Sequence, residues 1–86
     1  MVLKVFTQPN CPKCPAAKAL CAQISKQQPK LKIEQYDVST PEGLAEASFY
    51  AVLSTPSLIL VDDNGKEVRS WRGEVPSLKE ISGKLF

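Results

Sequence analysis

Two different spacings of apolar residues along the chain predict strands and helices. Short runs of apolar residues or of residue types that favour strands, each followed by residues that favour turns, predict four strands at residues 2–6, 31–38, 57–61 and 66–72. Three other segments carry helix signals, at residues 12–28, 41–52 and 77–85. The predicted order of elements is therefore β-α-β-α-β-β-α.

The first and last predicted helices have the clearest apolar faces. Residues 12–28 place apolar side chains at the i, i+3, i+4 and i+7 spacing of a helix laid on a sheet: Ala17, Leu20, Cys21 and Ile24. Ser77 and Glu80 have the spacing of a capping box at the start of the last helix, whose apolar face is Leu78, Ile81 and Leu85. Both helices are therefore expected to pack on the sheet.

Two local signals organise the middle of the chain. Ser39-Thr40-Pro41 supplies a hydroxyl cap and a first-turn proline for the helix at 41–52, in which Gly43 is a weak point. Asn64-Gly65 favours the positive φ angles of a tight hairpin turn. The last two strands are therefore expected to be antiparallel neighbours.

Composition restricts the possible functions. The 86 residues carry a net charge of +2 with dispersed Lys and Arg, which favours neither a nucleic acid nor a membrane surface as partner. No secretion signal or membrane span is expected. The three cysteines lie close together in the sequence, whereas a secreted disulfide scaffold has an even number of cysteines spread along the chain. We expect a single domain over residues 1–86, and a monomeric protein in the cytoplasm. The lack of histidine removes the most common general base.

The most specific chemical motif is Cys11-Pro12-Lys13-Cys14, which joins the first predicted strand to the first helix. Two thiols at this spacing can close a small disulfide ring with little backbone movement. Pro12 fits the first helical position. The free N–H groups of Lys13 and Cys14, together with the Lys13 charge, would lower the pKa of a thiol at Cys11. Cys11 is therefore expected to be the attacking sulfur and Cys14 the resolving one.

The cysteine pair by itself leaves three interpretations open. These are dithiol–disulfide chemistry, a metal clip made of soft thiolates, and two buried packing residues. Cys21 lies on the apolar stripe and is interpreted as a packing residue, although it could also be a third redox or metal-binding thiol. It lies two helical turns, ~10 Å, beyond Cys14, too far to share a bond with it.

Thr55 and Pro56 directly precede the most apolar strand, residues 57–61. A proline has no N–H for a strand ladder, so it marks the first residue of a strand. A cis bond between Thr55 and Pro56 would turn the chain sharply at this point. A trans proline would only end the preceding helix. Both interpretations stay open from local sequence.

The element order, the Cys-Pro-Lys-Cys motif, the Ser-Thr-Pro-Ser segment and the Asn-Gly hairpin together resemble the thioredoxin/glutaredoxin superfamily over residues 2–85. The chain is most similar to its small, glutaredoxin-sized members. The resemblance implies an α/β fold with a central four-stranded mixed sheet and helices on both faces. It also implies that Thr55 gives backbone hydrogen bonds to an extended substrate segment, and that Pro56 shapes the floor under Cys11.

The sequence departs from the family pattern at several positions. Thioredoxins typically have Trp before the first cysteine and a buried Asp six residues before it, where this chain has Asn10 and Val5. Glutaredoxins hold glutathione with a Gly-Gly and an Asp, where this chain has only Arg72-Gly73-Glu74. Trp71, beside that turn, is either a substrate-facing aromatic or a packing residue.

The leading hypothesis is a thiol–disulfide oxidoreductase that reduces protein disulfides through the Cys11–Cys14 dithiol, with no metal and no other cofactor. An upstream reductase or a low-molecular-weight thiol would recycle it. The alternatives are a copper or mercury carrier that binds through the same two cysteines, a glutathione-dependent glutaredoxin, and a non-catalytic adaptor. The residues expected to contact substrate are Pro12, Lys13, Thr55, Pro56, Trp71 and Gly73.

Overall fold

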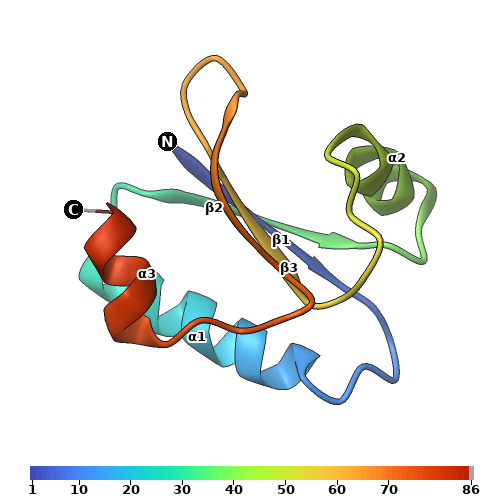
Figure 1. Ribbon diagram of the computed structural model, residues 1–86. Helices are drawn as coiled ribbons and strands as arrows, with labels where there is room; N and C mark the ends of the chain where they lie inside the picture. Colours follow the sequence, from blue (N-terminus) through green and yellow to red (C-terminus); the bar gives the residue numbers. More distant parts are fainter. Residues whose placement is uncertain (86) are drawn as a thin grey trace.

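The computed structural model describes residues 1–85, and its elements follow the predicted order (Figure 1). The strands are β1 (Val2–Thr7), β2 (Lys32–Asp37), β3 (Ser57–Val61) and β4 (Glu67–Arg72). The helices are α1 (Cys14–Gln27), α2 (Pro41–Phe49) and α3 (Leu78–Leu85). Each predicted strand agrees with the observed one to within a residue at either end, and the predicted fold class is confirmed.

Helix α1 begins two residues later than predicted. Lys13 caps the helix, and the proline of its first turn is Pro15, where a missing N–H costs nothing. The residues before it close a separate turn, in which the Cys14 N–H donates to the Cys11 carbonyl at 3.3 Å. The prediction that Pro12 is the first helical residue is therefore wrong.

Helix α2 ends at Phe49, three residues earlier than predicted. Ala51 has a φ of 55°, a left-handed conformation that cannot continue a helix. The Val52 N–H then donates back to the Ala47 carbonyl at 2.8 Å, which closes the end of the helix. The chain leaves α2 as an irregular segment that leads to Thr55.

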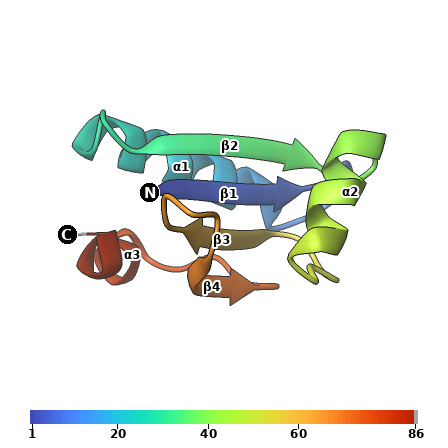
Figure 2. The same cartoon turned by 90° about the horizontal axis from the view of Figure 1, so that it is seen from above.

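The sheet has the strand order β2-β1-β3-β4. Strand β1 pairs in parallel with β2 and antiparallel with β3, and β4 is antiparallel to β3, so the sheet is mixed. Helices α1 and α3 cover one face and α2 lies against the other (Figures 1 and 2). None of the helices in residues 1–85 combines the length and apolarity needed to cross a bilayer.

Each face of the sheet has its own apolar core. The larger cluster lies under α1 and α3 and contains Leu3, Val5, Ala17, Leu20, Cys21, Ile24, Leu58, Leu60, Trp71 and Ile81. The smaller cluster lies under α2 and contains Phe6, Ala47, Val52, Ile59 and Val61. Strands β1 and β3 supply both clusters, which explains why residues 57–61 are apolar without interruption.

Candidate active site

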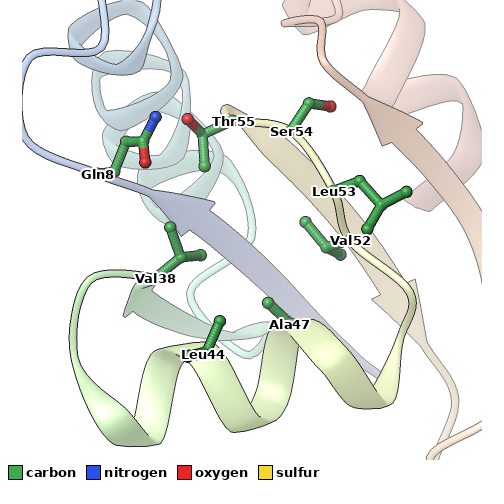
Figure 3. A pocket seen from close by; sticks show the side chains of 8 residues that line it. All are labelled: Gln8, Val38, Leu44, Ala47, Val52, Leu53, Ser54 and Thr55. Carbon is green, nitrogen blue, oxygen red and sulfur yellow. The ribbon is translucent and has the colours of Figure 1, made fainter.

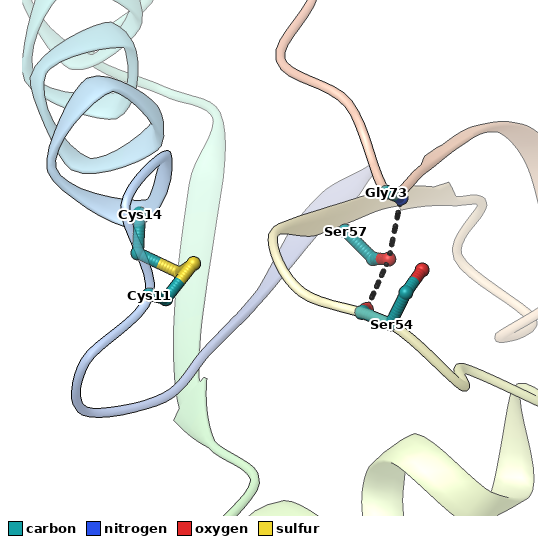
Figure 4. The surroundings of a disulfide bond; sticks show 5 residues. All are labelled: Cys11, Cys14, Ser54, Ser57 and Gly73. Atoms are coloured by element: carbon teal, nitrogen blue, oxygen red, sulfur yellow. Dashed lines mark hydrogen bonds between the residues drawn. A yellow bond between two sulfur atoms is a disulfide. The ribbon is translucent and has the colours of Figure 1, made fainter.

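The two cysteines of the motif form a disulfide at the amino-terminal end of α1 (Figure 4). Their Cα atoms lie 5.3 Å apart. Asn10, just before them, has a φ of 63°, a conformation that Asn adopts more readily than most residues and that turns the chain into the motif. Cys11 is partly exposed, whereas Cys14 is only 3% exposed. An incoming molecule can therefore reach Cys11 and not Cys14.

The register of the sheet brings two other segments to the end of the molecule that holds the cysteines. Phe6, near the end of β1, pairs with Ser57 at the start of β3, and Ser57 also pairs with Arg72 at the end of β4. Because β1 leads directly into the cysteine loop, the Thr55-Pro56 turn and the end of β4 lie at the edge where that loop begins. Figure 4 shows Ser54, Ser57 and Gly73 in the segments that face the disulfide.

The Thr55–Pro56 peptide bond is cis, which is one of the two conformations left open by the sequence. Pro56 is buried and Thr55 is partly exposed. The Ser57 hydroxyl donates to the Ser54 carbonyl at 2.7 Å and closes the turn around them. Thr55 is thus held at the surface on a turn that is fixed on both sides.

Gly73 ties the end of β4 to this turn. Its N–H donates to the Pro56 carbonyl at 3.0 Å and to the Ser57 hydroxyl at 3.2 Å. Its φ is +74°, and a Cβ at this position would lie 3.0 Å from the Ser54 hydroxyl oxygen. The position therefore needs glycine for its backbone conformation and for the close approach of Ser54.

Arg72 makes hydrogen bonds at this end of the molecule that the sequence did not predict. Its guanidinium donates to the Tyr50 carbonyl at 2.8 Å, and it holds the Glu67 carboxylate with hydrogen bonds of 2.8 and 3.2 Å. The hydrogen bonds from Arg72 to Glu67 lower the pKa of that carboxyl. The bond to Tyr50 ties Arg72 to the end of α2, five residues before Thr55. The separation of Arg72 from Tyr50 in sequence follows no helix or strand period, so no local pattern predicts this contact.

Trp71 does not join the site. It is 2% exposed and packs in the larger cluster, and the Arg69 guanidinium lies 5.6 Å from its ring centre. Because strand residues alternate between the two faces, Trp71 points under α3 while Arg72 points toward α2. The packing interpretation agrees with this position, and a substrate-facing role does not.

The other predicted residues near the motif are placed as follows. Pro12 and Lys13 are exposed beside Cys11. Val5 is fully buried in the larger cluster, and its hydrocarbon side chain cannot relay a proton to Cys14. Cys21 is 2% exposed, and burial raises the pKa of its thiol to about 11. The structure thus places Cys21 in the core as a protonated packing residue, outside the disulfide.

The part of the chain that the structure describes offers few ligands for a metal ion. Within residues 1–85, no group of three or more His, Cys, Asp or Glu side chains is placed to hold an ion. A metal-binding alternative would therefore depend on Cys11 and Cys14 alone.

Comparison with known proteins gives a consistent result. The family model for the thioredoxin domain matches residues 1–85. A probable thioredoxin of Archaeoglobus fulgidus is 36% identical over 62 residues, which are 72% of this chain and 67% of that protein. A thioredoxin of Methanocaldococcus jannaschii is 28% identical over 61 residues, 71% of each chain. The structure of thioredoxin 1 from Thermosipho africanus matches with a TM-score of 0.81 at 22% identity, covering 99% of this chain and 90% of that one.

The structural match shows the fold alone, whereas the family model and the two relatives are similar in sequence. The disulfide lies within the matched region and joins a partly exposed cysteine to a buried one, an arrangement that suits thiol–disulfide exchange. The chain belongs to the thioredoxin family and is a thioredoxin-like thiol–disulfide oxidoreductase with a Cys-x-x-Cys active site.

Proposed function

We propose that the protein reduces disulfides of other proteins, with Cys11 as the nucleophile and Cys14 as the resolving thiol. The observation that supports these roles is the difference in exposure between the two cysteines, since only Cys11 is open to an incoming disulfide. Cys14, at 3% exposure, can react only with a sulfur already bonded beside it. Thiolate access decides which sulfur attacks first.

The reaction balances in two exchanges. The Cys11 thiolate attacks one sulfur of the substrate disulfide, which forms a Cys11–substrate disulfide and releases the other substrate sulfur as a thiolate that takes a proton. Cys14 then loses its proton and attacks the Cys11 sulfur, which forms the Cys11–Cys14 disulfide and releases the second substrate thiol. The substrate gains two electrons and two protons, and the dithiol loses them.

Thr55 is proposed as the main-chain recognition edge beside this reaction. In residues 1–85 neither its N–H nor its carbonyl has a hydrogen-bond partner, because the β3 ladder begins only at Ser57. An extended segment of a partner can therefore pair there as an added strand. Pro56 is the buried residue of this turn. The bound segment would be bordered by the exposed Pro12 and Lys13 and by the partly exposed Gly73.

An external donor must return two electrons to the oxidised pair. An upstream reductase and a low-molecular-weight thiol are the two classes of donor that can do so. The proposal includes a single domain over residues 1–86, a monomeric state and a cytoplasmic location, where thiols are kept reduced. It includes neither a nucleic acid nor a membrane as partner, in keeping with the net charge of +2.

The test combines labelling with single substitutions. Iodoacetamide should modify Cys11 first in the reduced protein, with a pH midpoint below the free-cysteine value of about 8.5. Cys11→Ser should abolish reduction of a protein disulfide, and Cys14→Ser should accumulate a mixed disulfide at Cys11. Mass mapping identifies both products.

Cys21→Ala is the matched control for these variants. It should keep turnover near the wild-type value and lower the free energy of unfolding by about 1 kcal/mol, because it removes one buried small side chain. First labelling at Cys14 or Cys21, or a mixed disulfide at Cys14, would overturn the assignment. Recycling assays with glutathione and with a thioredoxin reductase would separate the two classes of donor.

A further inference from the structure

Leu53, Ser54 and Thr55 form the last part of the irregular connection between α2 and β3, here called the Thr55 segment (Figure 3). A groove of about 280 Å³ lies between this segment and α2, whose Leu44 and Ala47 line its other side. Leu53 and Ser54 are exposed, and Thr55 is partly exposed. Side-chain packing against α2 therefore does little to hold these three residues in place.

The Thr55 segment also has very few hydrogen bonds. Within residues 1–85, the Ser54 carbonyl is the only main-chain group of Leu53, Ser54 and Thr55 with a hydrogen-bond partner. That partner is the Ser57 hydroxyl, at 2.7 Å. Ser57 is 0% exposed, and its hydroxyl oxygen accepts from the Gly73 N–H at 3.2 Å. One buried hydroxyl thus joins the Thr55 segment to the end of β4 (Figure 4).

A second contact with the end of β4 holds the start of the same connection. The Arg72 guanidinium donates to the Tyr50 carbonyl at 2.8 Å. The Glu67 carboxylate accepts two further hydrogen bonds from this guanidinium, which fix its orientation. Because Arg72 directly precedes Gly73, adjacent residues at the end of β4 hold the connection near both of its ends.

These two contacts account for side chains that the fold alone does not require. Strand β3 is fully buried and is apolar apart from Ser57, and a buried hydroxyl lowers stability unless it is hydrogen-bonded. Arg72 lies at the surface with 34% of its side chain exposed, where an ion pair with Glu67 adds little to stability. What Ser57 and Arg72 share is the chain between Tyr50 and Thr55.

We infer that Ser57 and Arg72 are positioning residues for substrate recognition, because together they hold Thr55 where a substrate main chain can pair with it. The inference rests on the proposed function, in which Thr55 is the recognition edge. A backbone that is already ordered loses less conformational entropy on binding, so it pairs more tightly with a substrate. The two side chains act through the main chain of the connection and not on the reacting sulfurs.

Two mixed disulfides with the same leaving group test the inference on the reduced protein. One joins thionitrobenzoate to a cysteine in the middle of a short extended peptide, and the other joins it to 2-mercaptoethanol. The Cys11 thiolate attacks the sulfur of the peptide or of the mercaptoethanol, forms a disulfide with it, and releases thionitrobenzoate as a coloured thiolate. The recognition ratio is the rate constant for the peptide divided by that for the small compound, each relative to its reaction with dithiothreitol.

Two single variants and their combination are compared with the wild type. Ser57→Ala and Arg72→Lys should each lower the recognition ratio about fivefold, because Thr55 becomes mobile. Arg72→Lys keeps the positive charge but loses the planar fork that holds Tyr50 and Glu67 together. The small compound should react at the wild-type rate, and the pH midpoint for iodoacetamide labelling of Cys11 should not change.

The double variant tests whether the two contacts act on one connection. Its recognition ratio should fall by less than the product of the two single losses, because an edge that is free at one end gains little from the other contact. Arg69→Lys is the matched control: Arg69 is exposed on the same strand, and its contact with the Trp71 ring is one that a lysine can keep. It should keep the wild-type ratio.

The outcomes separate this inference from the proposed function. An unchanged recognition ratio in Ser57→Ala or Arg72→Lys, or an equal loss with both compounds, would overturn the positioning role of that residue while attack by Cys11 continues. A loss in Arg69→Lys as large as in Arg72→Lys, or a double loss equal to the product, would overturn the shared role. Urea unfolding checks that each variant is folded, and Arg72→Lys, at the surface, decides if Ser57→Ala is not.

The wild type alone gives two further outcomes. A wild-type recognition ratio near one would overturn the recognition edge at Thr55, and this inference with it, but not the roles of the two cysteines. Failure of the reduced wild type to attack either compound through Cys11 would instead contradict the proposed function.

Discussion

The two faces of the sheet are built differently. The face under α1 and α3 is closed by an apolar cluster of ten buried residues. The face under α2 has only five buried apolar residues, and a charged side chain, Lys4, reaches into it from β1. One face is therefore held mainly by apolar burial, and the other by a mixture of burial and polar contacts.

Lys4 is the centre of the polar part. Its ammonium lies 3.1 Å from Glu34 and 2.9 Å from Glu46, and 5.4 Å from the ring centres of Tyr36 and Tyr50. Burial alone would lower the pKa of Lys4, but hydrogen bonds to the two glutamates and to Tyr36 raise it above its ordinary value of 10.5. The pKa of Glu34 is lowered to about 2, mainly by the hydrogen bond from the Tyr36 hydroxyl and next by the hydrogen bond from Lys4.

The difference between the faces matches the division of roles at the site. Cys14 begins α1, which packs on the larger cluster, and Cys11 lies in the turn just before that helix and is joined to Cys14 by the disulfide. Thr55 and the groove lie beside α2, whose position depends on Lys4, on Arg72 and on the Tyr50 hydroxyl that donates to the Gly65 carbonyl at 3.1 Å. The disulfide and the proposed recognition edge thus depend on opposite faces of one sheet.

Adjacent residues of β3 give the largest expected effects. Leu60 and Ile59 are both 0% exposed but belong to the larger and the smaller cluster, respectively. We expect Leu60→Ala to lower the free energy of unfolding by about 3–5 kcal/mol and Ile59→Ala by about 2–3 kcal/mol, because the smaller cluster can close around a cavity more easily. Urea unfolding measures both. A larger loss for Ile59→Ala would contradict the ranking of the faces.

Two helical glycines sharpen the comparison at the level of single helices. A Cβ on Gly43, in α2, would collide with the Asp37 carbonyl oxygen, whereas no atom that the structure describes lies within 4 Å of a Cβ on Gly83 in α3. We expect Gly43→Ala to destabilise the protein by about 1–3 kcal/mol as an overpacked contact. Gly83→Ala should stabilise it by about 0.5–1 kcal/mol, as replacement of an unconstrained helical glycine does. Thermal unfolding of the pair, with wild type as reference, would reject this if both shifts had the same sign.

Two lysines that contact the same glutamate test the polar face. The Lys4 side chain is 13% exposed and that of Lys32 is 69% exposed, and both lie close to Glu34. Lys4→Met should cost about 1–2 kcal/mol, between the values for exposed and buried pairs. Lys32→Met should change the free energy of unfolding by less than about 0.5 kcal/mol. Similar losses in the two variants would show that burial of Lys4 does not matter.

The pH dependence of the same variants gives an independent measurement. The folded-state pKa of Glu34, about 2, lies below its ordinary value of 4.5. Its carboxylate therefore stabilises the fold above pH 4.5, and this contribution is lost as the pH falls from 4.5 toward 2. Lys4→Met should flatten that part of the stability profile and Lys32→Met should leave most of it. If the stability of Lys4→Met fell with pH as steeply as that of the wild type, Lys4 would not be a cause of the lowered Glu34 pKa.

The sequence by itself determined the order of the elements, the cysteine motif and the residues of the Thr55-Pro56 turn. These features depend on neighbours in the chain: the apolar stripe of the first helix, the Thr40 cap and the hairpin at Asn64-Gly65. The Thr40 cap is present as predicted, with its hydroxyl accepting from the Gly43 N–H at 3.0 Å. Local conformation follows local chemistry closely enough for such elements to be found without coordinates.

Only the tertiary structure decided the features that join segments far apart in the chain. It placed Trp71 in the core, where the sequence had left open a substrate-facing or a packing role. It showed why Gly43 is a glycine, through the approach of Asp37, and it joined Gly73 to Ser57 and Arg72 to Tyr50. The groove beside Leu53 likewise exists only where α2, β1 and the Thr55 segment meet, because a concave surface is a property of packed elements and of no single stretch of sequence.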